Sequence, residues 1–166
     1  MTLARRQSRL LVTGIAVAGL AITGVAWWER KFAEPTPLLR TDDPQLLERG
    51  RTLYMTQCAR CHGVNREGQA NWRERGADGR LPAPPHDEGG HTWHHPDEVL
   101  FRITKEGVAK AVGIPDYVSS MPAYGGTLSD AEIVAVLSWI KSQWPAQVRK
   151  DHDEINRQAR EAQRGS

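Results

Sequence analysis

The feature that most constrains this chain is the heptapeptide QCARCHG at residues 57–63. It holds the only two cysteines of the sequence, Cys58 and Cys61, and His62 follows them directly. A Cys-x-x-Cys-His string is a signature of c-type haem attachment, in which both thiols form thioethers with the haem vinyl groups. The adjacent imidazole then lies beneath the iron as its proximal ligand. The motif predicts one covalently bound haem c, with Cys58, Cys61 and His62 as cofactor-binding residues.

Two other kinds of site also use a Cys-x-x-Cys pair. A structural zinc site needs four ligands, and the missing ones would have to come from the downstream histidines His86, His91, His94 and His95. A thioredoxin-like pair should lie in a βαβ pattern, and no segment alternates as a strand would. Haem attachment is therefore the prediction, and a zinc-stabilised interaction module remains the alternative.

The N-terminal segment resembles an export or anchoring signal. Residues 10–28 carry no charge, and this length fits the hydrocarbon core of a bilayer as one helix. Three arginines precede the run and two tryptophans end it, which indicates an N-in, C-out orientation. We expect a cytoplasmic basic segment at 1–9, a transmembrane anchor at 10–28, and a haem domain in the periplasm or otherwise outside the cytoplasmic membrane. A signal peptide cleaved after Ala26 is the alternative.

The remaining charges exclude one class of partner and define the tail. The chain has 22 basic and 20 acidic residues, and nothing in this balance suggests a nucleic-acid binder, which would need a basic face. Residues 29–42, with two prolines, are expected to form a linker, and residues 43–145 the domain. The highly charged residues 146–166 have little apolar surface to bury, which predicts a solvated helix or a frayed end.

Three helices are predicted within the domain. Asp42 or Asp43 can cap a first helix with Pro44 in its first turn. A second is expected over Pro96–Glu106. The third is the clearest, because Ser129 and Glu132 form a capping box and Pro145 stops the helix. Residues 63–95 are rich in glycine, proline and polar residues and are expected to be mostly loop.

These motifs together resemble the class I c-type cytochromes over about residues 43–144. A helix with Gly50 and Tyr54 precedes the cysteine motif, and a Met121-Pro122 pair precedes the capped last helix. The resemblance implies an all-α cytochrome c fold, with three or more helices around one haem, following the N-terminal transmembrane helix. It also implies that the first and last helices cross at right angles, with Gly50 beside Trp139 and with Tyr54 and Val136 next to them.

The resemblance also implies roles in the haem site. Met121 is expected as the second axial ligand, so that His62 and Met121 together hold the iron. Met55 is the competing methionine, but it lies in the same helix as Cys58 and should not reach the opposite haem face. A carbonyl of Pro84 or Pro85 is expected to accept a hydrogen bond from the proximal histidine.

The roles of the remaining loop residues stay open. The indole of Trp93 is a candidate donor to a haem propionate. His91, His94 and His95 are most simply loop or propionate contacts, with copper binding or replacement of Met121 as alternatives. Five basic positions flank the haem segments and would steer docking if they ringed the haem edge: Arg49, Arg51, Arg60, Lys105 and Lys110.

The function implied is that of a monohaem electron carrier rather than an enzyme. Its expected redox partners in a respiratory chain are a terminal oxidase or a quinol:cytochrome c oxidoreductase, and methionine ligation would favour a high potential. The alternative is an open-site haem protein that handles peroxide or a gas, which would require that Met121 not be bound.

Overall fold

The computed structural model describes residues 38–165. Over this range the chain is all-helical and contains no strand, as predicted. The predicted segments 1–9 and 10–28, and the linker up to residue 37, lie outside the described residues. None of the helices within residues 38–165 is both long enough and apolar enough to cross a membrane.

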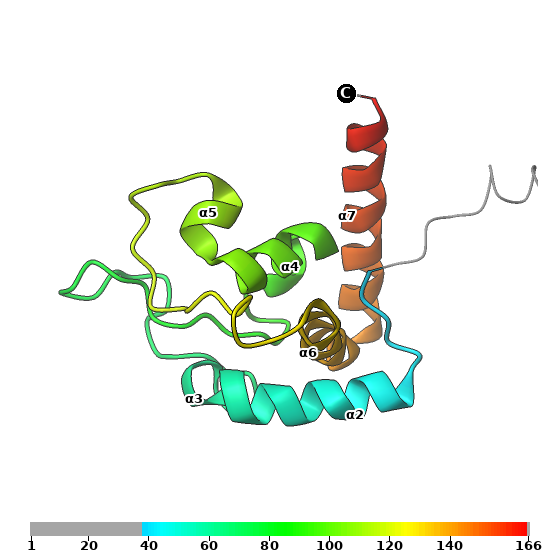
Figure 1. Ribbon diagram of the computed structural model, residues 1–166, viewed down its shortest axis with the longest axis horizontal. Coiled ribbons are helices and arrows are strands. Elements are labelled where there is room, and N and C mark those ends of the chain that lie inside the picture. The colour runs from blue at the N-terminus through cyan, green and yellow to red at the C-terminus, as the bar shows by residue number, and fades with distance from the viewer. Residues whose placement is uncertain (1–37, 166) are drawn as a thin grey trace, which may run out of the picture. The chain divides into compact units, whose positions relative to one another are not determined.

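The helices follow the order shown in Figure 1, and their bounds are listed here. They are α2 (Pro44–Leu53), a π-helical turn η1 (Tyr54–Cys58), α3 (Ala59–His62), a 3₁₀ turn η2 (Thr92–His94), α4 (Asp97–Glu106), α5 (Val108–Val112), α6 (Asp130–Ser142) and α7 (Ala146–Arg164). The three predicted domain helices correspond to α2, α4 and α6. The five-residue α5 was not predicted, because so short a helix carries no readable apolar period.

The predicted helix starts are confirmed at atomic detail. The Asp43 carboxylate accepts from the backbone N–H groups of Gln45 and Leu46, each at 3.1 Å. At the start of α6, the Ser129 hydroxyl accepts from the Glu132 N–H, and the Glu132 carboxylate accepts from the Ser129 N–H in return. These caps satisfy backbone donors that have no partner inside the helix.

The close crossing of α2 and α6 forms the frame of the domain. In Figure 1, α2 lies across the bottom of the view and α6 is seen nearly end-on above it. Gly50 of α2 is buried against α6, where a Cβ atom would lie 2.1 Å from the carbonyl oxygen of Ala135 and 2.8 Å from the Cβ of Trp139. Only glycine fits this approach. The predicted pairing of Gly50 with Trp139 is therefore confirmed.

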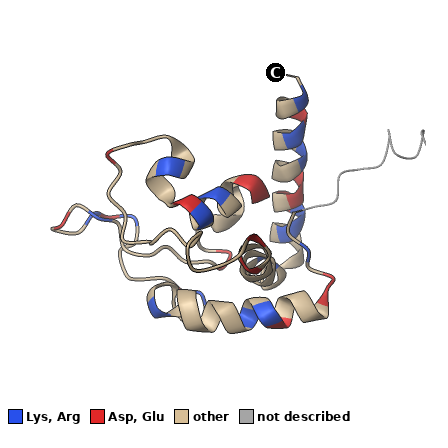
Figure 2. Ribbon diagram, in the orientation of Figure 1, with Lys and Arg blue, Asp and Glu red and all other residues tan. Residues whose placement is uncertain are grey.

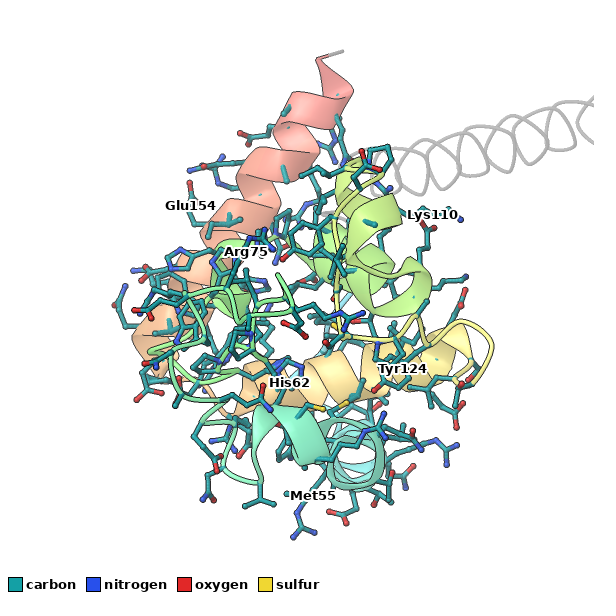
Figure 3. All side chains as sticks on the ribbon, turned by 90° about the vertical axis from the view of Figure 1, so that its left-hand side faces the viewer. Met55, His62, Arg75, Lys110, Tyr124 and Glu154 are labelled. Carbon is teal, nitrogen blue, oxygen red and sulfur yellow. The ribbon has the colours of Figure 1, made fainter. Side chains whose placement is uncertain are left out.

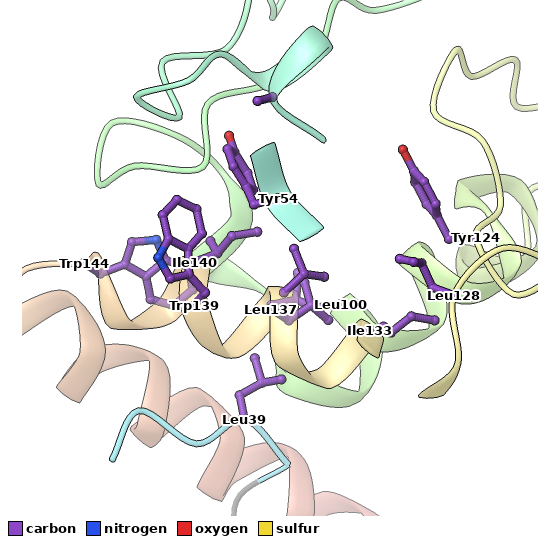
Figure 4. Close-up of a cluster of buried hydrophobic side chains, with 12 residues drawn as sticks. Leu39, Tyr54, Leu100, Tyr124, Leu128, Ile133, Leu137, Trp139, Ile140 and Trp144 are labelled. Atoms are coloured by element: carbon purple, nitrogen blue, oxygen red, sulfur yellow. The ribbon is translucent and has the colours of Figure 1, made fainter. Parts of the chain in front are cut away.

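The hydrophobic core lies along α6 (Figure 4). Tyr54 is fully buried, and its ring lies 4.7 Å from that of Trp139. Trp144 lies near one end of α6, and Leu128 and Tyr124 lie near the other. Leu39 is on the opposite side of α6 from Tyr54, toward α7.

The C-terminal tail is helical, but one side of it is not solvated. His152 and Asn156 of α7 are buried at 0% and 5% exposure. The Asn156 amide accepts from the Asp97 N–H at 2.7 Å and donates to the Asp97 carboxylate at 3.0 Å. That carboxylate also accepts from the Leu39 N–H. Figure 2 shows the alternating charges along α7, where Arg157 pairs with Glu154 and Glu161.

Candidate functional site: a cavity behind the cysteine motif

A cavity of about 950 Å³ opens beside the cysteine motif. Its walls bring together all four predicted site residues, Cys58, Cys61, His62 and Met121. The remaining wall is largely apolar and comes from α4, α5, α6 and the loops around them, including Leu100, Ile103, Val108, Val136, Leu137 and Ile140. A volume of this size with apolar walls is that of a cofactor pocket. The residues present therefore fit a haem.

The two cysteines are positioned by a change of helix type. The chain runs from α2 into a π-helical turn at Tyr54–Cys58 and then into the short α3, which carries Cys61 and His62. A single π turn inserted in an α-helix is common at functional sites, because it redirects the side chains that follow. Gly63 ends α3 with φ +82°, and its carbonyl accepts from the Tyr54 hydroxyl at 2.9 Å. The motif is thus fixed to the core at both ends.

The imidazole of His62 is held in one tautomer. Its Nδ1 lies 2.8 Å from the carbonyl oxygen of Pro84. A carbonyl can only accept, so Nδ1 carries the proton and Nε2 keeps its lone pair. Burial of the ring lowers the pKa of His62, against an opposing effect of the Pro84 hydrogen bond, so the neutral form is favoured. This is the arrangement in which histidine ligates a metal. Of the two prolines considered, Pro84 provides the carbonyl.

The Cys58 thiol is not activated as a redox thiol would be. Burial, followed by the proximity of Cys61, raises the pKa of Cys58 to about 11. Thioredoxin-like pairs instead have a lowered thiol pKa, and the described chain has no βαβ unit. Within residues 38–165, no three His, Cys, Asp or Glu side chains converge as metal ligands would. The geometry therefore gives no support to either the redox or the zinc alternative.

The loop that carries Met121 is anchored on both sides of the cavity. The Tyr124 hydroxyl donates to the Gln57 carbonyl at 2.9 Å, next to Cys58. The backbone N–H of Tyr124 donates to the Thr104 carbonyl of α4 at 2.9 Å. Met121 is partly buried and packs against the core. Tyr124 was not predicted as part of this site, although an aromatic residue close to Met121 was a signal for it.

The competing methionine lies elsewhere. Met55 is 40% exposed and is not part of the cavity wall. Figure 3 shows Met55 at the outside of the domain and His62 toward its middle, near the ribbon of α6. Of the two methionines named, only Met121 is placed to meet a group that occupies the cavity.

The histidine-rich loop forms part of the cavity wall. His91 and His95 face each other with their Nε2 atoms 2.9 Å apart, and His94 stacks on Trp93 at 3.7 Å. Within residues 38–165, these histidines do not converge as the three ligands of a copper site would. The indole N–H of Trp93 donates to the Glu88 carbonyl at 3.1 Å. The propionate contact of Trp93 stays a prediction.

The five basic positions differ in their surroundings. Four of them form ion pairs: Arg49 with Glu132, Arg51 with Glu48, Lys105 with Asp130, and Lys110 with Glu106. Arg60 instead lines the cavity. Arg73 and Arg80, from the loop after the cysteine motif, line it as well.

Comparison with known proteins agrees with this geometry. The family model described as cytochrome C oxidase, cbb3-type, subunit III matches residues 45–140, a range that contains the cysteine motif, Met121 and most of α6. No curated protein and no solved structure matches the chain. The matched range exceeds half of the 166 residues. The chain therefore belongs to the cbb3-type cytochrome c oxidase subunit III family, and it is a haem-based electron-transfer cytochrome with covalently attached haem c.

Proposed function

We propose that the chain is a monohaem electron carrier in which Cys58 and Cys61 attach the haem and His62 and Met121 ligate its iron. The observation that carries the proposal is the His62–Pro84 hydrogen bond, which leaves the Nε2 lone pair free in a cavity that Met121 also lines. Bound haem c supplies the iron that cycles between ferrous and ferric. The protein orients the ligands and excludes water with apolar walls.

Covalent attachment has a direct test. The protein should keep its haem stain on a denaturing gel after acid-acetone extraction, because thioether bonds survive this treatment. Replacement of Cys58 or Cys61 with serine should weaken or abolish the stain. Complete loss of colour from the unaltered protein would contradict the proposal.

Axial ligation by Met121 separates the carrier from an open-site haem enzyme. The unaltered protein should resist carbon monoxide and show the weak methionine-to-ferric-iron charge-transfer band in the red. Met121→Ala should open the site to carbon monoxide. Met121→His should give a low-spin haem of lower reduction potential, because axial-ligand identity shifts haem potentials over a range of about 0.8 V. Met55→Ala is the matched control and should behave as the unaltered protein does. Avid carbon monoxide binding by unaltered protein would favour the enzyme or gas-binding alternative.

The location and partner belong to the same proposal. The uncharged run at residues 10–28 supports a membrane anchor with the haem domain on the periplasmic side. The family description supports a terminal oxidase as redox partner, with a quinol:cytochrome c oxidoreductase as the other candidate. The full chain should stay with membranes through a high-salt wash, with its haem domain open to external protease. A soluble mature form beginning at Trp27 would instead indicate a cleaved signal peptide.

A further inference from the structure

His86 is an unusual neighbour for an axial ligand. Both of its ring nitrogens are buried without a hydrogen-bond partner, and among residues 38–165 the only other such buried side-chain atom is the Nε of Arg66. The two residues are joined by a backbone hydrogen bond of 2.8 Å from the His86 N–H to the Arg66 carbonyl. Buried polar atoms without partners are rare and costly, so each one calls for an explanation. An aliphatic side chain would fill this space without that cost.

The ring of His86 lies against the ring of His62. The two ring centroids are 3.9 Å apart and the planes meet at 88°, an edge-to-face contact. The hydrogen bond from Nδ1 to Pro84 restrains rotation of the His62 ring about its Cβ–Cγ bond, but it still allows the ring to pivot about that bond through a range of angles. A flat ring standing perpendicular to the imidazole at this distance blocks the pivot. Aliphatic side chains lack such a rigid edge.

The position of His86 is itself fixed from several directions. Its carbonyl accepts from the Trp144 indole N–H at 2.8 Å. Its ring makes a second edge contact with the ring of Tyr54, at 6.1 Å. Pro84, two residues earlier, is tied through its carbonyl to His62. Residues 84–86 therefore provide both the carbonyl that accepts from His62 and the ring that limits its rotation.

We propose that His86 is a positioning residue, whose ring edge holds the plane of the His62 imidazole and so sets the orientation of this axial ligand. The inference rests on the proposed ligation by His62. The orientation of a ligating imidazole affects the metal's electronic state and its potential. His86 also lines the cavity, and the proposed role acts on the haem through His62.

Two substitutions test the role of the flat ring. His86→Leu fills the space with an aliphatic side chain and removes the rigid edge. It should shift the g values of the low-spin ferric haem and its reduction potential. His86→Phe keeps a flat ring without nitrogen atoms, and its g values should stay close to those of the unaltered protein. Both are measured by electron paramagnetic resonance and redox titration of the purified full chain.

A second buried histidine provides the control. His152 is fully buried in α7 but is not part of the cavity wall, so His152→Leu should lower stability and leave the g values and potential unchanged. Unchanged g values and potential in His86→Leu would overturn the inference, as would an equal shift in His86→Phe. Failure of the proposed function is distinguishable, because the unaltered protein would then lack a low-spin, histidine-ligated spectrum.

Discussion

The close crossing of α2 and α6 makes Gly50→Ala a sensitive test of the fold. The new Cβ would lie 2.1 Å from the Ala135 carbonyl oxygen and 2.7 Å from its carbonyl carbon. Ordinary contact between such atoms begins at about 3.5 Å, so the helices must separate by roughly 1 Å. The obstacle is backbone and cannot rotate away. Separation would also loosen the Tyr54–Trp139 ring contact of 4.7 Å.

The expected loss of stability combines two opposing effects. Overpacking a well-packed contact costs about 1–3 kcal/mol, and the upper part of this range applies because backbone must move. The better helix propensity of alanine over glycine returns about 0.5–1 kcal/mol. We therefore expect Gly50→Ala to lower the free energy of unfolding by about 2 kcal/mol.

Urea unfolding followed by circular dichroism and tryptophan fluorescence measures this change. Gly126→Ala is the matched control, because a Cβ there would meet nothing within 4 Å, and its effect should stay within about 0.5 kcal/mol. Both variants keep the cysteine motif and should carry haem. If Gly50→Ala were as stable as the control, the close crossing would not be as described.

Three further changes test the contacts around α7 and the cysteine motif. Asn156→Ala leaves the buried Asp97 N–H without its partner and should cost about 1–3 kcal/mol in urea unfolding; no loss would mean that α7 is not docked there. Burial, followed by the proximity of Lys141, lowers the pKa of His152, while Asp97 opposes the shift. The unfolded chain therefore binds more protons at this residue than the folded chain does. The free energy of unfolding should fall as the pH drops through about 6.5. His152→Gln should reduce this loss between pH values of about 7.5 and 5.5, and an unchanged slope would contradict the assignment. Tyr54→Phe removes the donor to the Gly63 carbonyl and should cost about 1 kcal/mol without loss of covalent haem; retained stability would show that the bond contributes little.

The sequence predicts those parts of the fold that depend on local chemistry. The cap at Asp43 and the box at Ser129 and Glu132 are confirmed because each is a contact between residues two or three positions apart. The cysteine motif and Met121 also carry recognisable local patterns. Their meeting at one cavity follows from the α2–α6 crossing, which Gly50 and Trp139 indicate.

Contacts made by polar residues over long sequence separations were not predictable. The sequence of the tail predicts a solvated helix or a frayed end, because it lacks the apolar periodicity that indicates a buried helix face. The inner side of α7 instead depends on His152 and Asn156, whose burial is made possible by hydrogen bonds. Trp93 illustrates the same limit, because its partner is a backbone carbonyl that any residue at position 88 could provide.

A residue beyond the family match, which ends at residue 140, fixes the loop beside His62. The Trp144 indole, between α6 and α7, donates to the His86 carbonyl at 2.8 Å. This acceptor lies in the loop that carries Pro84. Loops are normally the most mobile part of a domain, yet this one must hold a hydrogen bond to a buried imidazole. The bond from Trp144 fixes this segment, which has no regular structure, beside the His62–Pro84 hydrogen bond.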